Sequence, residues 1–235
     1  MADDADQASQ ANQADEARAA FFRAIRAGDR AQVERSLAAQ PALSAARDAQ
    51  GVSAPLVALY HGEPAIATLL AEAGAPLDVF EAAALGRVER LGALLAADPA
   101  LAHAVAPDGF SPLGLAAFFG QAEAAHRLLE AGADPNRASQ NAMRVAPLHS
   151  AVAAQRLAIS EELLRHGADV NAAQADDFTP LHEAAQNGQL AMIELLLAHG
   201  ADPTARKSDG QTPLDVAEAH GQTAAAELLR RLAGG

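Results

Sequence analysis

A proline followed by leucine returns along this chain at a nearly constant spacing. The dipeptides are Pro55-Leu56, Pro112-Leu113, Pro147-Leu148, Pro180-Leu181 and Pro213-Leu214. The last three intervals are 35, 33 and 33 residues, whereas leucines in the following segments show one short interval of 24 residues between Leu70 and Leu94. A repeat of this length predicts stacked supersecondary units, because one such unit cannot bury its apolar face alone.

Residues 179–207, TPLHEAAQNGQLAMIELLLAHGADPTARK, show what one unit contains. Thr179 is expected to cap a short helix that begins at Pro180, since proline suits the first turn of a helix. Gly188 ends this helix, and residues 190–199 form a second amphipathic helix that Gly200 closes. The residues that follow carry turn chemistry without a helical period, so they predict a projecting loop. We call each such loop a finger.

These motifs resemble the ankyrin repeat, whose consensus combines T-P-L-H-x-A-A, a glycine, a double leucine and G-A-D. Residues 179–182 match the first element in full, and G-A-D recurs at 132–134, 167–169 and 200–202. The resemblance extends over about residues 18–233 and implies an all-α solenoid of about seven helix-turn-helix units with hairpin-like fingers. It also implies that His182 and His149 tie a finger to a helix start. The pattern departs at Ala146 and Ala54, which replace the capping threonine, and in a longer loop before Pro147.

The expected organisation is an acidic, disordered tail at residues 1–17 followed by a repeat domain at 18–235. The predicted units are 18–46, 47–79, 80–104, 105–137, 138–171, 172–204 and 205–235. Phe22 and Pro41 are separated from Phe80 and Pro99 by the same 58 residues, which indicates a duplicated pair of units. The finger before Phe80 is nearly absent, which predicts a notch in the concave edge. The last unit lacks G-A-D and is expected to be a polar cap.

Composition limits the classes of partner and the location that we expect for this chain. The formal net charge of −13 disfavours nucleic acid and anionic lipid, and no run approaches the ~18 apolar residues of a membrane span. The first residues lack the basic and apolar stretches of a secretory signal, so we expect a cytoplasmic protein. We also expect a monomer. Alanine richness is typical of a bacterial genome of high GC content. The absence of cysteine excludes disulfides and thiolate chemistry.

No catalytic, cofactor or metal site is predicted, and the chain is not expected to be an enzyme. Residues 182–186 begin like the zinc-protease signature H-E-x-x-H, but Gln186 occupies the position of the second histidine. His166 and His199 each precede a glycine at a helix end, where an imidazole favours the negative end of the helix dipole. The nucleophile elbow, the Walker loop and the dinucleotide fingerprint are absent from the sequence.

Aromatic residues make up only 3% of the chain, so those that the repeat leaves on fingers or first helices are candidate contacts. The predicted partner-binding residues are Tyr60, Phe110, Phe118, Phe119, Met143, Arg144, Phe178, Gln186, Asn187, Lys207, Gln211 and His220. Two alternatives remain open for the aromatics. Phe118 or Phe119 could fill the gap at the missing finger, and Phe110 and Phe178 could pack on an adjacent finger.

The predicted function is non-enzymatic binding of a folded protein through the concave face and the fingers. An acidic array favours a partner with a basic or mixed-charge surface. The alternative is a specific inhibitor or chaperone of one enzyme, or an effector that acts on the proteins of another cell.

Overall fold

The computed structural model describes the backbone of residues 2–233 and the side chains of residues 13–232. It divides into an N-terminal unit, Met1–Glu81, and a C-terminal unit, Ala82–Gly235, which are described separately. The described residues contain α-helices and short 3₁₀ helices but no strand, and a single isolated bridge joins Arg47 to Ser53. The prediction of an all-α fold is confirmed.

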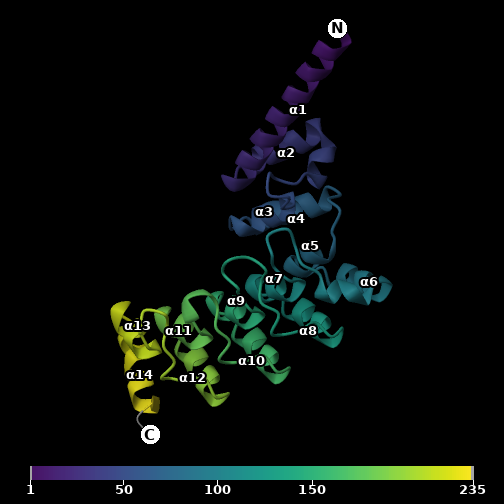
Figure 1. Cartoon of the computed structure of the whole chain (residues 1–235). Coiled ribbons are helices and arrows are strands. Elements are labelled where there is room, and N and C mark those ends of the chain that lie inside the picture. Colours follow the sequence, from purple (N-terminus) through teal and green to yellow (C-terminus); the bar gives the residue numbers. More distant parts are fainter. Residues whose placement is uncertain (1, 234–235) are drawn as a thin grey trace. The chain divides into compact units, whose positions relative to one another are not determined.

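The N-terminal unit contains two antiparallel helix pairs and the start of a fifth α-helix (Figure 1). Its elements are α1 (Ala2–Arg26), α2 (Arg30–Ala39), the 3₁₀ helix η1 (Pro41–Ala45), α3 (Ala54–Tyr60), α4 (Pro64–Glu72) and α5 (Val79–Ala84), whose last residues belong to the C-terminal unit. The sequence predicted a disordered tail at residues 1–17, whereas the structure carries α1 through that segment from Ala2. Burial begins further along the helix, where Phe21, Phe22 and Ile25 are buried.

The C-terminal unit stacks its helices in two rows. Its elements are α6 (Val88–Ala97), η2 (Pro99–His103), α7 (Pro112–Phe119), α8 (Ala122–Glu130), α9 (Pro147–Ala153), α10 (Leu157–Arg165), η3 (Ala175–Asp177), α11 (Pro180–Gln186), α12 (Leu190–Ala198), α13 (Pro213–Ala219) and α14 (Thr223–Ala233). The first helices α7, α9, α11 and α13 contact one another in series, and the second helices α6, α8, α10, α12 and α14 do the same (Figure 1). Each pair therefore buries its apolar face against its neighbours, as a solenoid requires.

Hydroxyl side chains cap the first helices. Ser53, Ser111, Thr179 and Thr212 each accept a hydrogen bond from a backbone N–H three residues further on, and a proline follows within the first turn. The expectation that Ala54 takes the place of the cap in the second unit is wrong. Because Pro55 occupies the second rather than the first helical position, the cap of α3 is Ser53. Ala146 does occupy the cap position of α9 and makes no such bond.

Small apolar residues fill the interfaces between helices. Leu113, Leu148 and Leu181 hold equivalent positions at the starts of first helices, and each is 1% exposed. Ala116, Ala151 and Ala184 are fully buried and let adjacent first helices approach closely. The last unit departs from this pattern, because the exposed Glu218 stands in α13 where α11 has the buried Ala185.

In the duplicated pair inferred from the sequence, the second helix of the first unit and the 3₁₀ helix after it match in the two copies, whereas the first helices, α1 and α5, differ in length. α2 and α6 have ten residues each, and η1 and η2 follow them at the same offset of 58 residues. Between α4 and α5 only residues 73–78 remain, so this junction has no finger. No helix among the described residues has the length and apolar character needed to cross a membrane.

Candidate functional site

Four fingers of the C-terminal unit close as short hairpins. In each one, a backbone N–H at the base donates to the carbonyl at the opposite base. The pairs are Ala106 to Phe110 at 2.9 Å, Ser139 to Val145 at 2.9 Å, Gln174 to Phe178 at 3.0 Å and Lys207 to Gln211 at 3.0 Å. We name the fingers by the residues at one base: the Phe110, Val145, Phe178 and Gln211 fingers.

Successive fingers are also joined to each other through the backbone. Gln140 N–H donates to Gly109 O at 2.8 Å, Ala175 N–H to Met143 O at 3.0 Å, and Ser208 N–H to Asp176 O at 3.0 Å. Side chains add to these links, since Asn141 Nδ2 donates to Asp108 O at 3.0 Å and Ser208 Oγ to Asp177 Oδ2 at 2.7 Å. The four fingers therefore form one continuous hydrogen-bonded edge.

His182 connects the start of α11 to the next finger. Its Nδ1 accepts from Thr179 N–H at 3.2 Å and lies 2.8 Å from Thr179 Oγ1, while its Nε2 donates to Gln211 O at 3.2 Å. Burial lowers the pKa of His182, which favours the neutral ring that these bonds require. The role that the family resemblance implied for this histidine is confirmed, and the finger that it holds is the one that follows its own helix.

His149 makes the corresponding bond to a finger but not the bonds to the start of its own helix. Its Nε2 donates to Phe178 O at 3.1 Å, and burial lowers the pKa of His149 to about 4. The buried Nδ1 has no hydrogen-bond partner within the described residues. The reason is local, because Ala146 lacks the hydroxyl that Thr179 offers to His182.

Three predicted contact residues lie together at the Phe178 and Gln211 fingers. The half-buried Phe178 ring packs 5.5 Å from the His182 ring, between centroids, and Lys207 Nζ lies 5.8 Å from the Phe178 centroid. Lys207 Nζ also donates to Asp209 Oδ2 and Gln211 Oε1, both at 3.0 Å. Phe178 thus packs on the adjacent finger, and Lys207 and Gln211 are part of the same contact.

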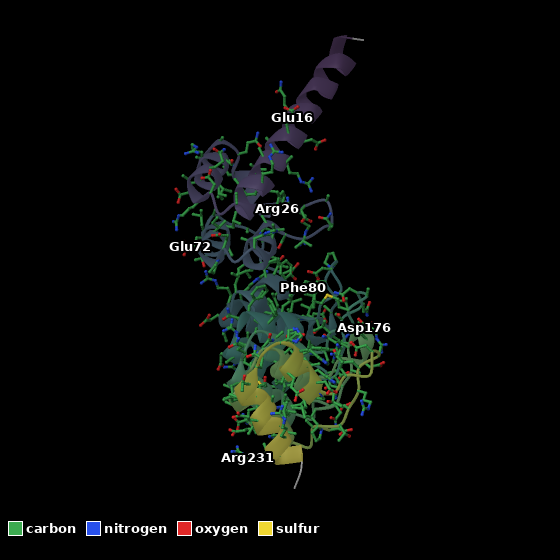
Figure 2. All side chains as sticks on the ribbon, turned by 90° about the vertical axis from the view of Figure 1, so that its left-hand side faces the viewer. Glu16, Arg26, Glu72, Phe80, Asp176 and Arg231 are labelled. Atoms are coloured by element: carbon green, nitrogen blue, oxygen red, sulfur yellow. The ribbon has the colours of Figure 1, made fainter. Side chains whose placement is uncertain are left out.

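The Val145 finger presents two exposed candidates. Met143 has 56% of its surface exposed, and Arg144 beside it is exposed with a positive φ of 53°. Phe110 is half-buried at the base of its own finger. In Figure 2 the labelled Asp176 of the Phe178 finger lies on the loop edge of the C-terminal unit, away from Arg231 near the end of α14.

Other candidates lie at the ends of first helices. Phe118 is 43% exposed and meets the half-buried Phe119 edge to face, with ring centroids 5.2 Å apart. Tyr60, at the end of α3 in the N-terminal unit, is 38% exposed.

The remaining candidates lie at the C-terminal ends of α11 and α13. Asn187 is exposed and donates to Glu183 Oε1 at 2.8 Å, and the half-buried Gln186 offers its carbonyl to Gln222 Nε2 at 3.1 Å. The exposed His220 is held by its own helix end, because its Nδ1 lies 2.9 Å from Val216 O.

Sequence comparisons agree with this geometry. A family model described as three copies of the ankyrin repeat matches residues 79–174, and one described as many copies matches residues 163–217. The chain belongs to the ankyrin-repeat family. Ankyrin repeats are generally protein–protein interaction modules and are typically not enzymes.

Two curated relatives contain a similar stretch. The human neurogenic locus notch homolog protein 4 is 44% identical over 78 residues, and the Drosophila melanogaster neurogenic locus Notch protein is 47% identical over 72 residues. These stretches cover 33% and 30% of this chain but only 4% and 3% of the relatives. The likeness therefore concerns the ankyrin repeats alone.

An asparagine ladder that sequence reasoning missed joins the ankyrin units at the edge that carries the G-A-D motifs. Asn136 Nδ2 donates to Gly167 O at 2.9 Å, and its Oδ1 accepts from Asp169 N–H at 2.7 Å. Asn171 repeats both bonds with Gly200 and Asp202, at 3.1 and 2.8 Å. The available signal was an asparagine two residues after G-A-D.

A buried carboxyl group was also missed. Glu81 is fully buried in α5, where its Oε2 accepts from Asp78 N–H at 3.0 Å and its Oε1 lies 3.9 Å from Arg47 Nη2. Burial raises the pKa of Glu81 to about 7, and the nearby Asp78 carboxylate acts in the same direction. Asp78 and Glu81 close the start of α5 in the manner of a capping box, with Asp78 Oδ1 accepting from Phe80 N–H at 2.8 Å.

No cluster of three or more potential metal ligands occurs in the part of the chain that the structure describes. His182 is engaged on both ring nitrogens, and Gln186 stands one turn away from it. Residues 182–186 therefore do not supply two histidine ligands to one metal.

Proposed function

We propose that this ankyrin-repeat protein captures a folded protein through the concave face of its repeats and the tips of its fingers. The observation that supports the proposal most directly is the hydrogen-bonded edge that joins the four fingers of the C-terminal unit. A surface that is ordered before binding loses less conformational entropy when a partner docks. The finger contacts therefore favour a preformed binding surface.

The chemistry of the fingers favours a mixed contact. Met143 supplies exposed apolar area, and Arg144 supplies a guanidinium beside it. Asp176, Asp177 and Asp209 place carboxylates at the tips of the next two fingers. Together with the net charge of −13, these groups suit a partner with a basic or mixed-charge surface.

The test is affinity purification from cells of the source organism with isotope-labelled quantification. The altered bait carries Met143→Ser and Arg144→Asn, because asparagine tolerates the positive φ of position 144. The matched control is Leu232→Ser, which removes a side chain that is 45% exposed at the end of α14. We expect one stoichiometric partner with the native bait and the control, and its loss with the altered bait.

Equal capture by the altered bait would refute the finger contact. Recovery of no stoichiometric partner by the native bait would argue against the proposed function as a whole. If the partner is an enzyme, its activity with and without added ankyrin-repeat protein distinguishes inhibition from scaffolding.

A further inference from the structure

The N-terminal unit has a pocket between α1 and a finger of its own. Asp48 N–H donates to Val52 O at 2.8 Å, which is the bond that closes each finger of the C-terminal unit, and we call this loop the Val52 finger. A pocket of about 410 Å³ is lined by residues of α1 and of this finger. Its volume lies within the range of about 300 to 1,000 Å³ that is typical of ligand sites.

Three arginines of α1 line this pocket. Arg18, Arg23 and Arg26 are all exposed, and Arg26 lies in the last turn of the helix (Figure 2). Residues 18–26 contain no aspartate or glutamate, although the formal net charge of the chain is −13. The pocket therefore concentrates guanidinium groups on a chain that is otherwise acidic.

Two carboxylates also line the pocket, and one of them is already paired within the unit. Asp48 Oδ1 accepts from Gln50 N–H and from Val52 N–H, both at 3.0 Å, and Asp48 Oδ2 lies 3.2 Å from Arg26 Nη2. The side chain of Asp48 is only 9% exposed, whereas Asp15 is exposed on α1. The three guanidiniums thus outweigh the carboxylate that solvent reaches.

The first and last of the three arginines are held in place and still have donors to offer. Arg26 pairs with Asp48, and its Cζ lies 5.7 Å from the centroid of the buried Phe22 ring. Arg18 Nη2 donates to Arg47 O and lies 3.5 Å from Asp48 O. A guanidinium carries five N–H donors, and these bonds use only Nη2 of each arginine. Both groups are therefore oriented for an anion before one binds.

The spacing of the arginines fits an extended peptide. Arg18 and Arg26 are eight residues apart on a helix, so about 12 Å separates them along its axis. In an extended chain, side chains at positions i and i+4 lie on one face about 13 Å apart. Arg23 lies between the two and makes no hydrogen bond or ion pair with any other residue that the structure describes.

We propose that this pocket binds an extended acidic segment of a partner protein, in which two carboxylates four positions apart pair with Arg18 and Arg26. Arg23 contacts the segment between these two ion pairs. Charge complementarity selects this occupant, because the net charge of the chain repels an acidic segment and the three guanidiniums attract it locally. The pocket shares no residue with the fingers of the C-terminal unit, and the inference does not depend on the function proposed above.

The experiment measures the fluorescence anisotropy of labelled peptides that are titrated with the full-length chain. The probe is GSESASESG, whose glutamates are four positions apart. One control is GSEESASSG, which has the same composition with adjacent glutamates, and the other is GSQSASQSG, which has no charge. We expect the probe to bind more tightly than either control, and its affinity to fall as ionic strength rises. Equal affinity for the probe and either control would refute the proposed pairing, as would no binding of the probe.

Variants of the chain test the pocket itself. Arg23→Gln should weaken probe binding by about fivefold, the loss expected for one exposed ion pair, and the fold should be unaffected because Arg23 is exposed and bonded to no described residue. The matched control is Arg165→Gln, which makes the same change of charge at an exposed position of α10 and should leave the affinity unchanged. Equal affinity of the Arg23 and Arg165 variants would overturn the proposal.

Arg18→Gln together with Arg26→Gln should weaken probe binding more than Arg23→Gln does, and far-UV circular dichroism checks that this double variant folds. Met143→Ser should retain probe binding, which separates the pocket from the finger surface.

Two further measurements distinguish other occupants of the pocket. Inorganic phosphate should displace the probe no better than sodium chloride of equal ionic strength, and stronger displacement by phosphate would assign the pocket to a small anion. A dimer of the native chain that Arg23→Glu converts to a monomer in sedimentation equilibrium would assign the pocket to a second copy. Either result would overturn the proposal.

Discussion

Replacing Ala146 by threonine should stabilise the protein, because α9 is the one first helix after a finger that lacks a side-chain cap in the C-terminal unit. At the equivalent position of α11, Thr179 Oγ1 accepts from His182 N–H and lies 2.8 Å from His182 Nδ1. The same hydroxyl at position 146 would cap α9 and donate to the unpaired Nδ1 of His149.

The expected gain combines two effects. A threonine cap contributes about 1 kcal/mol relative to alanine, and a hydrogen bond to a buried acceptor contributes about 0.5 to 1.5 kcal/mol. Position 146 is 4% exposed and position 179 is 6% exposed, so both hydroxyls lie in comparable surroundings. We expect a total of about 1.5 to 2.5 kcal/mol, which corresponds to an increase in Tm of about 3 to 10 °C for a chain of this size.

Thermal and urea denaturation monitored by far-UV circular dichroism measure this gain at pH 7.5. Ala146→Val is the matched control, because valine has nearly the volume of threonine but no hydroxyl. Equal stabilisation by valine would show that volume rather than hydrogen bonding is responsible. A histidine titration by NMR adds a second readout, since the new donor should lower the pKa of His149 further below its value of about 4.

Three further predictions concern the packing of the units. Glu81 has a pKa of about 7 in the folded chain, above the ordinary 4.5, so the stability of the folded chain should fall as the pH rises from 4.5 to 7. Glu81→Gln should abolish this dependence of stability on pH, which urea titrations at a series of pH values measure. Leu181→Ala should lower the free energy of unfolding by about 2 to 5 kcal/mol, because Leu181 is 1% exposed. Leu190→Ala should lower it by under about 1 kcal/mol, because Leu190 is 42% exposed. Equal losses in the denaturation midpoint of the two variants would contradict the stacking. Asn171→Ala should lower the free energy of unfolding by about 1 to 2 kcal/mol, because it removes two hydrogen bonds to the next unit. Thr204→Ala should lower it by less, because the hydrogen bonds of Thr204 stay within its own loop. Hydrogen exchange at Asp202 N–H measures the difference between the two variants.

Much of the fold could be predicted from the spacing of a few residue types. Proline after a hydroxyl residue, glycine at helix ends and leucine at helical intervals each act within one turn, so the sequence alone places them. The cap of α3 shows the limit of this reasoning. Aligning Pro55 with the other prolines pointed to Ala54, but proline fits either of the first two helical positions, and the packed helix uses Ser53.

The candidate contacts were less predictable, because the exposure of a side chain depends on residues in the next unit. Phe110 and Phe178 have equivalent positions in sequence, and both are half-buried. Lys207 lies against the Phe178 ring only because the Gln211 finger is bonded to the Phe178 finger. Met143 is more exposed than any of the predicted aromatic contacts, which its residue type alone did not indicate.

The sequence by itself determined the family, the alternation of short helices and the places where fingers occur, since all three follow from local periodicity and capping. Only the tertiary structure decided which polar groups are paired between units. The Arg47 guanidinium near the fully buried Glu81, the bond from His149 Nε2 to Phe178 O and the asparagine ladder all join residues of neighbouring units. Such contacts join residues about 30 positions apart, and their geometry is fixed only when the units stack.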